Sequence, residues 1–195
     1  MTLFEFLLFV HVAMAVIWVG GGLMMQFFGL RASMSRDPAR LAAVGEDIEW
    51  IANRVFIPTS LLAFLSGLAL VWESAYDFGD DWIVIGLALY AVTFLAGLLF
   101  LGPESARIGM LVEQGSPEAG PRTLRLILLS RLDLVVLFLL VYDMTVKPSF
   151  DDSALLEGLL AAGLAAAVVY WRYKVALGQP PPGPGPAAGT PTEPG

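Results

Sequence analysis

The chain has 195 residues, of which 57% are hydrophobic and only 15% are charged. A soluble domain has about 25% charged residues, so this sequence has too few to form a water-facing surface. Its formal net charge of −7 excludes nucleic acid as a partner, because that function needs a basic surface. The absence of cysteine excludes disulfides, thiolate metal sites and Fe–S clusters, and one histidine excludes a multi-histidine centre within one chain.

Five apolar segments are long enough to cross a bilayer as helices. About 20 residues are needed, because a helix rises ~1.5 Å per residue and the hydrocarbon core is ~30 Å thick. The first segment has no basic N-terminal region and exceeds the apolar length of a signal peptide, so we expect it to be retained. The sequence therefore predicts an all-α, polytopic transmembrane bundle with spans at 3–30, 55–72, 82–101, 124–146 and 154–171.

Short amphipathic helices are predicted in two connections between spans. Ser35-Arg36-Asp37-Pro38 is a typical helix start, since a capping side chain precedes a proline at the first helical position. Apolar residues then recur at helical spacing up to Ile51, which predicts a helix on the membrane surface leading into the second span. Pro103 is predicted to open a similar short helix that ends at Gln114-Gly115.

The distribution of Lys and Arg predicts the orientation of the bundle. Of the 11 basic residues, only Lys147 lies on one side, and the other ten lie in or beside the connections on the opposite side. The basic side of a membrane protein is cytoplasmic, which predicts an outer N-terminus in a bacterial plasma (inner) membrane. Residues 1–175 then form the bundle, and the Pro/Gly-rich residues 176–195 are predicted to be a disordered cytoplasmic tail.

The first span carries the single histidine, His11, on a face with unusual composition. Helix positions seven apart lie nearly one above another, so His11, Trp18 and Met25 share this face with Gly22 between them. It is a candidate site for haem b, with His11 as the metal ligand and Trp18, Gly22 and Met25 beside the porphyrin. Two other interpretations stay open. His11 would hydrogen-bond a neighbouring helix, the common structural role, or it would transfer protons.

Charged side chains inside spans form a second candidate site. In a bilayer they are rare and often mark the path of a transported species. Asp133 is expected to pair with Arg54 or Arg131, and Asp143 with Lys147 four residues later. The alternative function is therefore a small transporter, or an accessory or scaffold subunit of a transport system. The residues of this intramembrane polar set are Arg54, Arg131, Asp133 and Asp143.

Two further expectations concern neighbours. Glu5, Tyr142 and Asp143 would form a polar mouth above His11 if the first and fourth spans are adjacent. The fifth span has a face of small residues, Gly158, Ala162, Gly163 and Ala167, that suits docking on the bundle, a homodimer or another membrane partner. The sequence has no phosphate loop, serine elbow or zinc motif, so an enzyme is the minority interpretation.

The stretch His11-x6-Trp18-Val19-Gly20-Gly21 resembles the opening of several bacterial membrane families. It is similar to the copper-resistance D domain and to the haem-biosynthesis membrane protein described as a protoporphyrinogen oxidase. The best overall resemblance is to the predicted integral membrane proteins of domain-of-unknown-function (DUF) family 2269, over about residues 3–148, where Arg131-Leu132-Asp133…Met144-x-Val146-Lys147-Pro148 also matches. The haem-linked relatives imply a haem ligand at His11 alone. The copper-resistance relatives use more metal donors than this chain has, so copper transport is not implied.

Overall fold

The computed structural model describes residues 1–178 except Arg36, with side chains up to Arg172 except those of Arg36 and Pro38. All regular structure in these residues is helical, which confirms the predicted all-α bundle. Most of the predicted tail, from position 179 onward, lies outside the described residues. The elements are α1 (Leu3–Met34), α2 (Pro38–Ile51), η1 (Ala52–Phe56), α3 (Ile57–Glu73), α4 (Asp81–Ala96), η2 (Gly97–Leu101), α5 (Gly102–Glu113), α6 (Ala119–Val146) and α7 (Ser153–Gly178).

Four helical stretches of the described chain are long and apolar enough to cross a membrane: 3–34, 39–73, 81–113 and 153–172. The 28-residue α6 is not among them, because it contains five charged residues, Arg122, Arg125, Arg131, Asp133 and Asp143, and the last three lie within its apolar part. This helix contacts α1, α2, α4, α5 and α7. The least apolar long helix is thus the one surrounded by other helices, where its polar groups meet protein instead of lipid.

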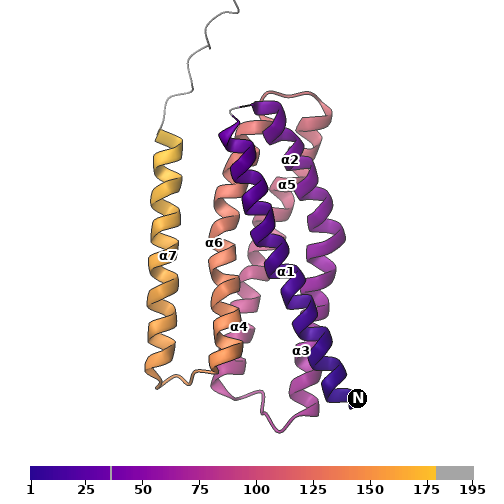
Figure 1. Cartoon of the computed structure of the whole chain (residues 1–195), viewed down its shortest axis with the longest axis vertical. Coiled ribbons are helices and arrows are strands. Elements are labelled where there is room, and N and C mark those ends of the chain that lie inside the picture. Colours follow the sequence, from indigo (N-terminus) through magenta and orange to yellow (C-terminus); the bar gives the residue numbers. More distant parts are fainter. Residues whose placement is uncertain (36, 179–195) are drawn as a thin grey trace, which may run out of the picture.

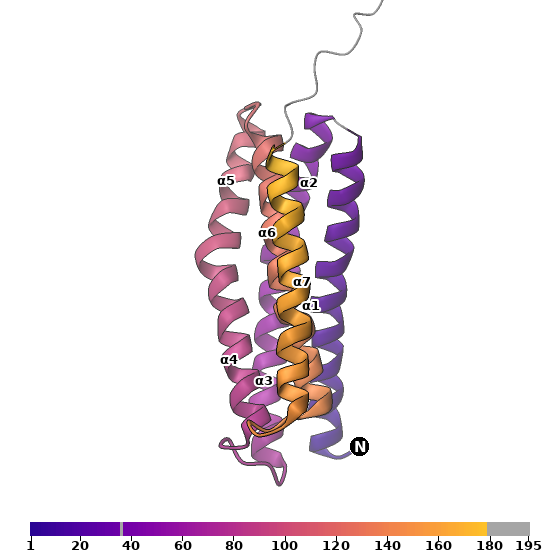
Figure 2. The same ribbon diagram turned by 90° about the vertical axis from the view of Figure 1, so that its left-hand side faces the viewer.

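Two long helices are continuous across positions at which the sequence predicted one helix to end and the next to begin. α2, η1 and α3 form one continuous rod, and so do α4, η2 and α5 (Figures 1 and 2). Each π-helical segment ends immediately before an X-Pro pair, Ile57-Pro58 or Gly102-Pro103. A proline inside a helix lacks an N–H group and clashes with the carbonyl four residues earlier, and the wider π turn accommodates that defect. Pro103 therefore does not open a separate helix.

The helices α1, α3, α4 and α6 run side by side, and α7 stands outside them next to α6 (Figures 1 and 2). α2 and α5 extend the bundle at one end, called the α2–α5 end. The opposite end, called the loop end, holds residues 74–80 and 147–152. α2 packs against α5 and α6 instead of lying apart on a membrane surface, which differs from the prediction.

The α2–α5 end has a tightly packed interior. Ile108 and Thr123 are both 0% exposed, and they press on the backbone of Gly45. Arg122 donates a hydrogen bond of 2.9 Å to Glu104, and this bond raises the pKa of the guanidinium, which stays charged. Helix α2 begins as predicted, because the Asp37 side chain accepts a hydrogen bond of 2.9 Å from the Ala39 backbone.

Candidate functional site

His11 on α1 faces α3. Its Nδ1 lies 2.7 Å from the backbone oxygen of Ala63, and the Ser66 hydroxyl lies 3.5 Å from the same nitrogen. A carbonyl oxygen only accepts hydrogen bonds, so Nδ1 carries the proton that it donates. The ring also lies against Gly67, where a Cβ atom would approach its Cε1 to 3.0 Å. This arrangement leaves Nε2 as the nitrogen available to a ligand.

The rest of the predicted haem face meets helices α4 and α6. Trp18 makes an edge-to-face contact with Tyr90 of α4, with ring centroids 6.0 Å apart. Gly22 lies opposite Leu134 of α6, where a Cβ atom would be 3.6 Å from that side chain. Met25 is buried. The four residues therefore lie on one face of α1, as predicted, and this face is covered by helix packing along its length.

Tyr90 is the centre of an aromatic cluster inside the bundle. Its ring stacks on Phe64 at 4.5 Å and on Phe94 at 5.8 Å, in addition to the contact with Trp18. Its hydroxyl donates to the backbone oxygen of Ser60 at 3.4 Å. This cluster joins α1, α3 and α4 at the middle of the bundle, which explains a tryptophan far from both membrane boundaries.

Arg131 has a neutral partner instead of an acidic one. Its Nε donates to the Gln26 side-chain oxygen at 3.0 Å, and the Gln26 amide donates to Ser130 at 2.7 Å. This polar link connects α1 with α6. The side-chain oxygen of the glutamine accepts one hydrogen bond in this link, and its NH₂ group donates the other.

Asp133 is held by α4. Its Oδ1 accepts a hydrogen bond from the buried Thr93 hydroxyl. Among the described residues no ion pair joins Asp133 to Arg131 or to Arg54, which differs from the expectation. Arg54 lies in η1 with an exposed side chain, and Arg131 is engaged by Gln26.

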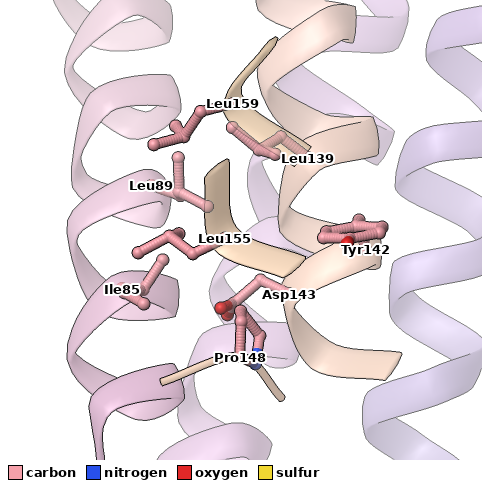
Figure 3. A pocket seen from close by; sticks show the side chains of 8 residues that line it. All are labelled: Ile85, Leu89, Leu139, Tyr142, Asp143, Pro148, Leu155 and Leu159. Atoms are coloured by element: carbon pink, nitrogen blue, oxygen red, sulfur yellow. The ribbon is translucent and has the colours of Figure 1, made fainter. Parts of the chain in front are cut away.

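Asp143 is 1% exposed, and neither carboxyl oxygen has a hydrogen-bond partner in the structure. Its carboxyl group points toward α4 and lines a pocket between α4, α6 and α7 (Figure 3). The expected ion pair with Lys147 is not formed. Lys147 ends α6 in the left-handed conformation, with φ 54°, and its amine lies 4.2 Å from the Tyr76 ring centre and 4.7 Å from that of Trp82.

The expected polar mouth above His11 does not assemble either, although α1 and α6 are in contact. Glu5 accepts a hydrogen bond from the Thr2 backbone and caps α1. The Tyr142 hydroxyl donates to the backbone oxygen of Ala154 at 2.9 Å, so it faces the start of α7. Within the part of the chain that the structure describes, no three His, Cys, Asp or Glu side chains are grouped as a metal site.

The polar groups of the interior follow one another along the bundle. Their depths, counted from the loop end of each helix at a rise of ~1.5 Å per residue, are ~5 Å for Asp143, ~10 Å for Ser66, ~14 Å for Tyr90 and ~20 Å for Asp133. Sequence reasoning did not single out Ser66, Tyr90 or Thr93, because hydroxyl side chains are common in transmembrane helices. The signal for each of them is its contact with a group on another helix, and only the fold provides that.

The comparisons with known proteins agree with this architecture. A family model described as "Predicted integral membrane protein (DUF2269)" matches residues 5–148, which is more than two thirds of the chain. The chain belongs to the DUF2269 family. The match covers α1 through α6 and stops at Pro148, so α7 lies outside it. Neither the curated proteins nor the solved structures contain a match to this DUF2269 protein.

Proposed function

We propose that this DUF2269 protein is a small transporter that moves protons or small cations along α6. One observation carries the proposal: α6, the long helix with charged side chains inside its apolar part, is the one enclosed by the bundle. Its Arg131 and Asp133 are engaged by side chains of α1 and α4, and Asp143 faces a pocket. Intramembrane ionisable groups in such positions are the usual components of ion and proton paths.

The chemistry of this path favours positive cargo. The carboxyl groups of Asp133 and Asp143 can each take up a proton or pair with a cation. In depth along the bundle, His11 lies between these two carboxyl groups, with its Nδ1 beside Ala63 and Ser66 of α3 and its Nε2 available. Arg131 closes the series nearer the α2–α5 end, where its fixed positive charge would control access. A transported anion would meet two carboxyl groups, which argues against anionic cargo.

The proposal is tested with purified protein in liposomes that contain a pH-sensitive dye. A potassium diffusion potential should drive a proton flux above that of protein-free liposomes. Asp133→Asn, which keeps the side-chain shape and removes the titrating group, should lower this flux at least fivefold. The matched control is Asp47→Asn, an exposed carboxylate on α2, which should leave it unchanged. A flux equal to that of empty liposomes, or one that Asp133→Asn does not alter, contradicts proton transport.

A haem or redox role has a separate observation in its favour. Ligand histidines usually donate their second ring N–H to a carbonyl or carboxylate, which fixes the ring and leaves the other nitrogen for the metal. The 2.7 Å bond from His11 Nδ1 to Ala63 has this form. Haem b bound through Nε2 would require the helices that cover Trp18 and Gly22 to separate.

The haem role is tested by the visible spectrum of the protein purified in detergent after expression with added haem precursor. A Soret band that is lost in His11→Ala supports it. Colourless protein would contradict it, and so would a band that His11→Ala leaves intact. The transport assay is independent of this result.

A further inference from the structure

Two arginines, Arg131 of α6 and Arg172 of α7, lie on the sides of these helices that face each other. α6 and α7 are antiparallel neighbours (Figure 1). A Cβ atom at Gly158 would lie 2.6 Å from the Tyr142 ring, so these two residues mark one level of the contact. Along α6, Arg131 is about three helical turns from Tyr142, and along α7, Arg172 is about four turns from Gly158. Whole turns return to the same face, and the levels of the two arginines differ by only ~5 Å.

These arginines form a pair of like charges. Arg172 is close enough to Arg131 for their positive charges to act on each other. No ion pair of the described residues includes either side chain. The hydrogen bond from Arg131 Nε goes to the neutral Gln26, and Asp133 is turned to Thr93 of α4. Because guanidinium groups stay charged in proteins, the pair is unfavourable unless an anion lies beside it.

The pair lies at the membrane boundary of the α2–α5 end. The apolar span of α7 is Ser153–Arg172, and its 20 residues cover ~30 Å, the thickness of the hydrocarbon core. Arg172 is therefore at the level of lipid headgroups, next to Trp171, which is 66% exposed, as is typical of interfacial aromatic residues. Farther into the membrane, two turns from Arg131 on the same side of α6, Phe138 is 49% exposed. The positive pair is thus followed by an apolar surface.

We propose that Arg131 and Arg172 bind the phosphate group of an anionic phospholipid, whose acyl chains pass Phe138. Guanidinium groups bind phosphate through paired N–H···O bonds, and basic sites between transmembrane helices on the cytoplasmic side are suited to anionic headgroups. A zwitterionic lipid fits less well, because the two arginines would repel its ammonium group. The bound lipid would connect α7, which lies outside the family match, to the rest of the bundle. This inference goes beyond the transport proposal and does not depend on it.

The test is native mass spectrometry of the full-length protein in a nonionic detergent with added phosphatidylglycerol. One lipid per chain should bind at least tenfold more tightly than phosphatidylcholine with the same acyl chains. Arg172→Gln should weaken phosphatidylglycerol binding about fivefold, and Arg172→Lys, which keeps the charge, should weaken it less. The matched control is Arg107→Gln, which removes an exposed arginine of α5 at the same end of the bundle. It should change the affinity less than twofold.

Inorganic phosphate at millimolar concentration distinguishes a lipid site from a site for a free anion. It should displace less than half of the bound phosphatidylglycerol, because it lacks the acyl chains that also contact the protein. Complete displacement would overturn the assignment to a lipid. Equal affinities of the unmodified protein and Arg172→Gln overturn the inference, and so do equal losses in Arg172→Gln and Arg107→Gln. Because Arg172 is exposed, its substitution should leave the gel-filtration profile unchanged.

Discussion

At the scale of single residues, the last turn of α6 shows how the fold separates the two members of an expected ion pair. Asp143 and Lys147 have the four-residue spacing of a helical ion pair, and the sequence predicts that contact. In the structure Lys147 is no longer helical: with φ 54° it ends the helix, and its amine turns to the aromatic rings of Tyr76 and Trp82. The turn therefore links α6 to the α3–α4 loop, and Asp143 faces its pocket without an ion-pair partner.

Two substitutions at Lys147 should therefore differ in stability. The left-handed conformation costs ~1–2 kcal/mol for a residue with a Cβ atom, and glycine avoids that cost. Both Lys147→Ala and Lys147→Gly lose the cation–π contacts, worth ~0.5–1 kcal/mol at an exposed site, but only glycine also removes the backbone cost. We expect the glycine variant to unfold at a higher temperature than the alanine variant in detergent. The opposite order would show that the backbone conformation of Lys147 is different.

At the scale of elements, glycines decide how closely the helices approach one another at the α2–α5 end. A Cβ atom on Gly45 would lie 2.5 Å from both Thr123 Oγ1 and Ile108 Cγ2, and these two side chains are fully buried. In contrast, a Cβ atom on Gly20 of α1 would meet nothing within 4 Å. The two glycines are indistinguishable by sequence pattern, since both lie within helices.

The variant Gly45→Ala should lower the free energy of unfolding by ~1–3 kcal/mol, because overpacking forces α2 away from α5 and α6. The control Gly20→Ala should leave stability unchanged or raise it by up to ~1 kcal/mol through helix propensity. Thermal unfolding of both variants, followed by circular dichroism in one detergent, provides the comparison. Equal stabilities would mean that the α2–α5 end is looser than the structure describes.

At the scale of the whole molecule, the distribution of charge predicts that the α2–α5 end faces the cytoplasm. Arg31, Arg107, Arg122 and Arg125 lie at this end, while Lys147 is at the loop end with Asp77, Asp80 and Asp81. Such a bias orients membrane proteins with the basic side inward. The opposite orientation would put nearly all the basic residues outside.

The natural chain contains no cysteine, so single introduced cysteines report this orientation cleanly. In intact cells, a membrane-impermeant maleimide should label Asp77→Cys in the α3–α4 loop. It should label Ser116→Cys, between α5 and α6, only after the membrane is opened. Labelling of Ser116→Cys in intact cells would reverse the predicted topology. A reporter fused after Gly178 should independently be active only on the cytoplasmic side.

The sequence by itself determined the class of the protein, because apolar length and scarce charge leave a chain of this kind no stable alternative to membrane helices. It also identified α6 as unusual, since charge within a span has to be accommodated. The partners of these charges were decided by tertiary structure: Thr93 for Asp133, Gln26 for Arg131, and a pocket for Asp143. Helical periodicity shows which residues share a face of one helix, whereas these contacts depend on which helices are neighbours. The prolines are a second case, because in the sequence they predict helix boundaries. In the structure, α2 and α5 pack on α6 and continue into α3 and α4 as unbroken helices, and a π turn beside each proline accommodates its missing hydrogen bond.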